Sequence, residues 1–116
     1  MRALKSFDYK ILSEYMENYQ TLVDEYKTQA SQMTEQRYNR VKSIVKGITE
    51  VYNNATLQEQ QLIKMLWWDK QPYDIIADVL GVTEYTIKHA REVILRRVAE
   101  RSTYLWYMTK KALEPS

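Results

Sequence analysis

The sequence predicts an all-α protein, and three observations carry that prediction. Apolar residues recur at steps of three and four along most of the 116-residue chain. Only two glycines and two prolines are present, whereas a fold of strands and tight turns needs many residues that reverse the chain. Helix-capping residues stand before several of the apolar stripes. We therefore expect about five helices.

The first expected helix spans roughly residues 4–30 and has a stripe rich in tyrosine: Leu4, Phe7, Ile11, Tyr15, Tyr19, Leu22 and Tyr26. Because a tyrosine hydroxyl tolerates partial exposure, we expect this helix at the edge of the fold or between two subunits. Residues 28–36 are polar and lack a stripe, which indicates a connection. The chain accordingly divides into an N-terminal helical arm at 1–33, a candidate dimerisation element, and a helical domain at 34–116.

Thr34 is expected to cap the second helix, whose inward face carries Tyr38, Val41, Ile44, Val45, Ile48 and Tyr52. Gly47 lies inside this helix, where glycine costs about 1 kcal/mol against alanine. A close crossing with another helix would explain its presence. The third helix begins at a capping box of Thr56 and Glu59, in which each side chain accepts from the backbone N–H of the other residue.

A single glycine separates the fourth and fifth helices. Pro72 ends the preceding helix and suits the start of one over Tyr73–Leu80, while Thr83 is expected to cap a helix that runs past Arg101. Gly81 can adopt the left-handed conformation that ends a helix. The inward residues are Ile76, Ala77, Leu80, Gly81, Val82, Ile87, Ala90, Ile94 and Val98. This order is typical of a helix-turn-helix, which we expect over residues 73–100.

The inward stripe leaves the other side of the fifth helix facing solvent. In helix-turn-helix proteins the N-terminal half of this helix enters the major groove of DNA. The residues we assign to base edges are Glu84, Tyr85, Lys88, His89 and Glu92. Those we assign to phosphates are Thr83, Thr86, Arg91, Arg96 and Arg97. The alternative interpretation is an ordinary solvated face, with salt bridges at the two adjacent arginines.

The distribution of charge favours the nucleic-acid interpretation. Residues 83–111 carry seven Lys or Arg against three Glu, a balance of +4, whereas residues 1–60 balance eight against eight. The net charge of the whole chain is only +2, which permits DNA binding without requiring it. The positive charge is thus concentrated in the segment expected to meet DNA.

Several classes of function are disfavoured. The absence of cysteine excludes a disulfide framework and a thiolate zinc site, and a single histidine, His89, excludes a histidine-rich metal site. The pair Asp74 and Asp78 lacks an evident third ligand. We expect no metal, no cofactor and no enzymatic activity. No apolar run approaches the ~20 residues of a membrane span, and the first residues lack an apolar signal-peptide core, so we expect a cytoplasmic protein without a membrane partner.

Residues 62–100, LIKMLWWDKQPYDIIADVLGVTEYTIKHAREVILRRVAE, resemble the region of sigma factors that reads the −35 promoter element. They are more similar still to the small phage late-gene activators of the RinA/ArpU type. Residues 40–63 resemble the helix pair that precedes the motif in those activators. The resemblance implies a phage or prophage regulator that binds double-stranded DNA upstream of late packaging and structural genes and acts with host RNA polymerase.

Two other classes remain open. A small-terminase-like subunit that recognises DNA for packaging also uses a helix-turn-helix, and it assembles into rings. A helical protein-interaction module could use the same corner of two helices without binding nucleic acid. Steep salt dependence of DNA binding would separate the first two classes from the third. A dimer, which we expect for a regulator with a two-part site, differs from a ring in mass.

Overall fold

The computed structural model describes residues 3–113, and every regular element in that range is helical. The all-α prediction is therefore confirmed. The elements are α1 (Ser6–Glu17), α2 (Tyr19–Thr28), η1 (Ala30–Gln32), α3 (Glu35–Asn54), α4 (Leu57–Ile63), η2 (Lys64–Trp68), α5 (Tyr73–Leu80), α6 (Glu84–Arg101) and α7 (Tyr104–Leu113). Here η1 is a short 3-10 turn and η2 a π-helical turn.

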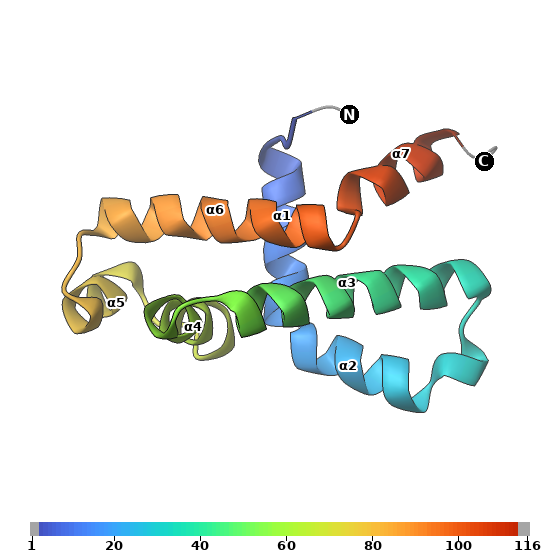
Figure 1. Ribbon diagram of the computed structural model, residues 1–116, viewed down its shortest axis with the longest axis horizontal. Helices are drawn as coiled ribbons and strands as arrows, with labels where there is room; N and C mark the ends of the chain where they lie inside the picture. The colour runs from blue at the N-terminus through green and yellow to red at the C-terminus, as the bar shows by residue number, and fades with distance from the viewer. Residues whose placement is uncertain (1–2, 114–116) are drawn as a thin grey trace.

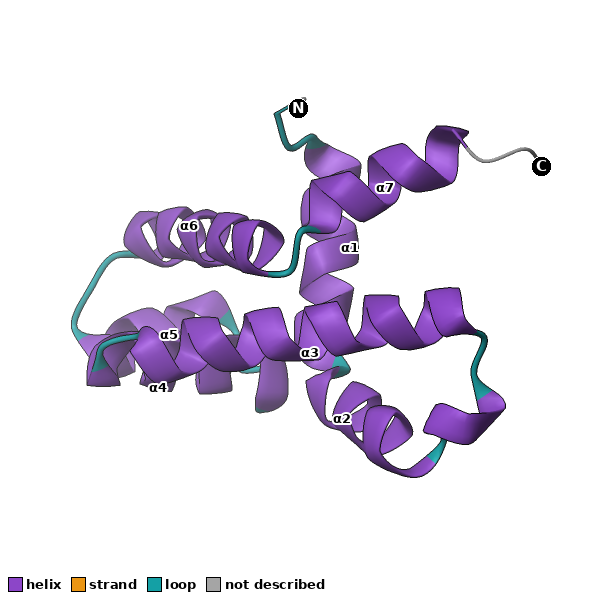
Figure 2. Ribbon diagram, turned by 45° about the vertical axis from the view of Figure 1, so that its right-hand side comes forward, coloured by secondary structure: helices purple, strands orange, loops and turns teal. Residues whose placement is uncertain are grey.

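The two longest helices, α3 and α6, run antiparallel beside each other and form the centre of the fold (Figure 1). Helix α1 crosses α6 steeply, as Figures 1 and 2 both show, while α4 and α5 lie at one end of α3 and α2 at the other. The core between these helices is aliphatic and includes Ile44, Ile48, Ile63, Ile76, Ile87, Ile94, Leu95 and Val98, each at most 2% exposed. The inward stripe predicted for the fifth helix therefore packs as expected, with Ala90 half-buried.

Helix α1 belongs to the same core. Leu12 and Met16 are at most 1% exposed, and α1 packs against both α6 and η2. The indole N–H of Trp67 donates to the Ser13 hydroxyl at 3.0 Å, and that of Trp68 to the Met16 carbonyl at 3.1 Å. The boundary predicted after residue 33 falls just before α3, and α1 is nevertheless packed into the fold that contains α5 and α6.

Most of the predicted tyrosine stripe packs within the chain. Tyr15, Tyr19 and Leu22 are partly buried against the core. Tyr19 also stacks on Trp68, and Tyr26 stacks on Tyr38 of α3 at 5.5 Å between ring centroids. Dimerisation through this helix stays a prediction, but these rings already have partners in their own chain.

The expectation of about five helices was low, because residues 3–113 contain seven α-helices. The first expected helix is divided at Asn18, whose backbone (φ −95°, ψ 13°) ends α1. The last is divided at Ser102 and Thr103, where Thr103 takes a left-handed conformation at φ 53°. The other three helices begin as predicted: α3 and α4 follow the side-chain caps Thr34 and Thr56, and α5 begins at Tyr73. Thr83 caps α6, as predicted for the start of the last helix.

The close helix crossing suggested by Gly47 is present. A Cβ placed on Gly47 would lie 2.8 Å from the Cβ of Ser102 and 2.9 Å from its backbone nitrogen. Ser102 is fully buried at the end of α6, so α3 and α6 approach each other through a glycine with no room for a side chain. In the described residues no helix is both long and apolar enough to cross a membrane.

Candidate nucleic-acid interface

The turn between α5 and α6 has the geometry that the sequence predicts for it. Gly81 adopts φ 69° and ψ 34°. Its N–H donates to the Asp78 carbonyl at 3.3 Å, and the N–H of Val82 donates to the Ala77 carbonyl at 3.0 Å. These two bonds form a Schellman motif, which satisfies the carbonyls left open at a helix end. Helix α5 therefore stops at a defined residue.

Helix α6 begins at Glu84, directly after Thr83, which caps it. The Thr83 hydroxyl accepts from the backbone N–H of Thr86 at 3.1 Å, and the two threonine hydroxyls lie 2.9 Å apart. Ile76 and Ile87 are at most 1% exposed and Ala77 only 8%, so the small side chain of Ala77 lets α6 pass close over α5. The direction of α6 is thus fixed by a cap at its start and by packing behind it.

The outer face of α6 is uncovered. All five residues predicted to contact bases, Glu84, Tyr85, Lys88, His89 and Glu92, are exposed. Tyr85 is 78% exposed, so its ring is open to a partner. Tyr85, His89 and Glu92 follow one another at steps of four and three, so they form one stripe along the helix. Arg96, a further four residues on, continues that stripe and is also exposed.

Two ring contacts order this face. Tyr85 and His89 stack nearly parallel, with 6.4 Å between ring centroids and 6° between ring planes. The Lys88 ammonium lies 5.9 Å from the centroid of the Tyr73 ring at the start of α5. Tyr73 was not among the predicted site residues. Its contact with Lys88 depends on how α5 packs beside α6, and no local sequence pattern indicates this packing.

The residues predicted to contact phosphates do not form one continuous patch. Thr83, Thr86, Arg96 and Arg97 are exposed, and Arg91 is half-buried. Arg97 already pairs with Glu59 at 2.7 Å, across to the capping box that begins α4. The hydrogen bond from the Thr56 backbone N–H, and after it this pairing with Arg97, lowers the pKa of Glu59 below its usual range. Arg97 therefore joins α6 to α4 whatever else it binds.

An acidic edge borders the start of α6. A shallow hollow of about 450 Å³ is lined by Asp74, Asp78 and Glu84 together with Ala77, Gly81 and Val82. In the sequence this pair of aspartates lacks an evident third ligand, and in the structure Glu84 lines the same hollow. No group of three or more potential metal ligands occurs among the described residues. Because this edge repels phosphate, a nucleic-acid backbone would pass on the side of Lys88 and Arg96 instead.

Comparisons with protein-family models, with curated proteins and with solved structures found no match to this chain.

Proposed function

We propose that the chain is a double-stranded DNA-binding regulator of transcription, and that the outer face of α6 enters the major groove. The observation that carries this proposal is the exposure of Tyr85, Lys88 and His89 on a helix whose opposite side is fully packed. A rigid helix with an uncovered face of donors and acceptors is what direct reading of base edges requires.

The charge distribution supports the orientation of the bound duplex. Lys88 and Arg96 lie on the exposed side of α6, whereas Asp74, Asp78 and Glu84 border its start. We infer that Lys88 and His89 read bases and that Arg96 contacts a phosphate. Thr83, Thr86, Arg91 and Arg97 are the further candidates for phosphate contacts. Arg97 can contribute N–H groups that Glu59 does not occupy, since a guanidinium has five.

The wider role rests on the sequence resemblance alone. We propose that the chain acts in a bacterial cytoplasm as a phage or prophage activator of late genes, with host RNA polymerase as its partner, and that it is not an enzyme. A dimer on a two-part DNA site is the assembly we expect. Transcription in vitro from a template that carries the selected site would rise with added protein if the chain is an activator.

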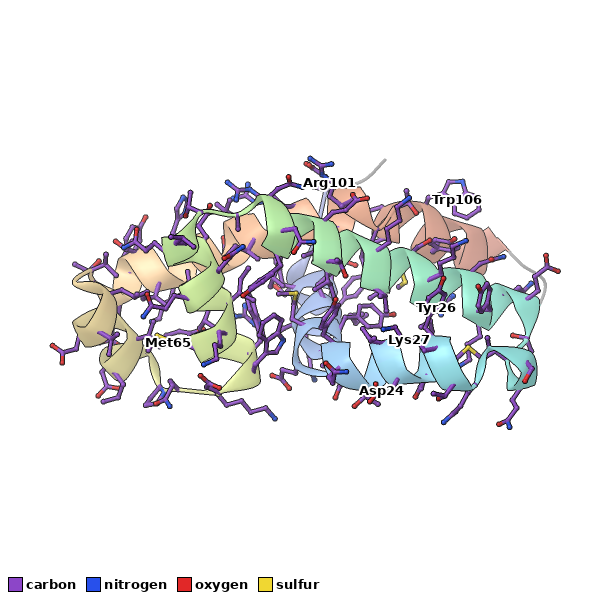
Figure 3. All side chains as sticks on the ribbon, turned by 60° about the horizontal axis from the view of Figure 1, so that its bottom comes forward. Asp24, Tyr26, Lys27, Met65, Arg101 and Trp106 are labelled. Carbon is purple, nitrogen blue, oxygen red and sulfur yellow. The ribbon has the colours of Figure 1, made fainter. Side chains whose placement is uncertain are left out.

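Selection from random duplexes at low salt, followed by footprinting on the enriched sequence, tests the proposal. Lys88→Ala and His89→Ala should each cost about 1–3 kcal/mol on the selected site and relax discrimination between bases. Arg96→Ala should weaken all sequences about equally. The matched control is Lys27→Ala, at the residue labelled in Figure 3. Lys27 lies on α2, at the far end of the molecule from α5 (Figure 1).

Equal, sequence-independent losses at Lys88, His89 and Arg96 would overturn the base-reading assignment. The failure of any duplex to bind at low salt would overturn the DNA-binding proposal itself, and would leave the interaction module as the better interpretation. A ring-sized mass in solution, with DNA binding retained, would favour the packaging subunit over the regulator.

A further inference from the structure

A hollow of about 590 Å³ lies where the start of α1, the end of α6 and the start of α7 meet. Its walls are mostly apolar and are formed largely by Leu4, Tyr9, Ala99, Leu105 and Trp106. Trp106 lines this hollow, is 47% exposed and projects outward from α7 (Figure 3). The volume is within the range of about 300–1,000 Å³ that small-molecule sites occupy, and aliphatic and aromatic walls are typical of them.

The polar side of this hollow carries one positively charged and one negatively charged side chain. Arg96 and Glu100 both line it and stand one helical turn apart on α6, with Thr103 beside them. Neither side chain makes an ion pair or hydrogen bond with any residue in the described range. The neighbouring arginines are paired elsewhere, since Arg97 binds Glu59 at 2.7 Å and Arg101 lies 3.7 Å from Glu50. Within the described residues, the two charges at the hollow therefore have no partner, and in the absence of DNA both can meet a ligand.

We propose that this hollow binds an α-amino acid with a large apolar side chain. The Arg96 guanidinium donates to the ligand carboxylate, and the Glu100 carboxylate accepts from the ligand ammonium. Side chains one turn apart on a helix have Cβ atoms about 5–6 Å apart, so both can converge on the adjacent charges of one amino acid. The apolar side chain lies against Leu4, Tyr9 and Trp106. Glu100 would repel a simple anion and Arg96 would repel a simple cation. A zwitterion, which offers an opposite charge to each side chain, is therefore preferred.

Calorimetric titration of the full chain tests this proposal independently of DNA. The ligands are L-tryptophan, indole-3-propionate, which lacks the ammonium, tryptamine, which lacks the carboxylate, and glycine, which lacks the apolar group. We expect L-tryptophan to bind with one-to-one stoichiometry. Each analogue with a single charge should bind about tenfold more weakly, and glycine should not bind measurably.

Two variants assign the charges. Arg96→Gln should weaken L-tryptophan about tenfold without weakening tryptamine, which lacks the carboxylate, whereas Glu100→Gln should weaken L-tryptophan without weakening indole-3-propionate, which lacks the ammonium. Both residues are exposed, so both variants should fold, and Lys27→Gln is the control. The proposal is overturned if L-tryptophan does not bind, if the three indoles bind equally, or if neither variant changes the affinity. A dimer that Arg96→Gln dissociates would instead assign the hollow to a second copy of the chain.

Discussion

Gly47 and Ser102, which are far apart in sequence, are in direct contact where α3 crosses the end of α6. A Cβ on Gly47 would come within 2.8 Å of the Ser102 Cβ and 2.9 Å of the Ser102 nitrogen, and backbone cannot move aside as a flexible side chain can. This contact sets the spacing of the two helices on which the exposed face of α6 depends. Because of this contact, even the single methyl group of alanine at Gly47 should lower the stability of the fold.

Gly47→Ala should therefore lower the free energy of unfolding by about 1–2 kcal/mol. The strain of forcing α3 away from α6 outweighs the roughly 1 kcal/mol that alanine normally gains in a helix. Urea denaturation measures the change, and Lys46→Ala, at an exposed position of the same helix, is the control. An alanine variant more stable than the wild type would contradict the crossing.

Gly81→Ala should also destabilise the protein, but for a different reason. No atom lies within 4 Å of a Cβ at this position, so the cost comes only from the left-handed backbone at φ 69°. We expect a loss of about 1–2 kcal/mol for alanine and a smaller loss for Gly81→Asn, because asparagine tolerates this conformation. Thermal unfolding of the pair measures the difference. Equal losses for alanine and asparagine would mean that the backbone conformation is not the cause.

The Tyr104 hydroxyl donates to the buried Asp8 carboxylate at 2.7 Å and so ties α7 to α1. Tyr104→Phe should lower the free energy of unfolding by about 1.5–3 kcal/mol, since it removes a donor from a fully buried carboxylate. Tyr107→Phe is the matched control, because its hydroxyl lies 3.1 Å from that of Ser43 in a partly buried place. Equal effects of the two variants would argue against the importance of the α1–α7 link.

The stability of the fold should fall in acid partly through Glu59. The backbone N–H of Thr56 and the Arg97 guanidinium hold the pKa of Glu59 below its ordinary value of 4.5 in the folded state. The unfolded chain therefore binds a proton first, and the stability that Glu59 contributes is present above that value and lost as the pH falls through the lowered pKa. Measured from about pH 6 to about pH 3, Glu59→Gln should flatten the dependence of unfolding free energy on pH. An unchanged slope would contradict the pairing.

Local rules were sufficient where a helix boundary depends on neighbouring residues. Thr83 and Gly81 could be assigned from sequence because a cap and a left-handed stop are made within a few residues. The same rules located the capping box of Thr56 and Glu59. The exposed face of α6 followed from these boundaries and from helical periodicity.

Tertiary contacts explain what the sequence did not reveal. The break after Arg101 depends on the burial of Ser102 against Gly47, and the position of Lys88 depends on Tyr73 of another helix. The partner of Arg97 is Glu59, which lies 38 residues away in the sequence on another helix, so no local pattern indicates it. The hollow beside Arg96 joins segments from both ends of the chain, so its existence has no signal in any one stretch.

We propose that DNA binds at the exposed face of α6, and the chain's lack of cysteine allows a direct test of this. Tyr85→Cys and Lys27→Cys would each carry a single thiol, and its reaction with a maleimide can be timed with and without a selected duplex at low salt. We predict that bound DNA slows the reaction at Tyr85→Cys at least about tenfold, because the thiol then lies in a groove, and leaves Lys27→Cys unchanged. Equal rates at Tyr85→Cys with and without saturating DNA would contradict the account.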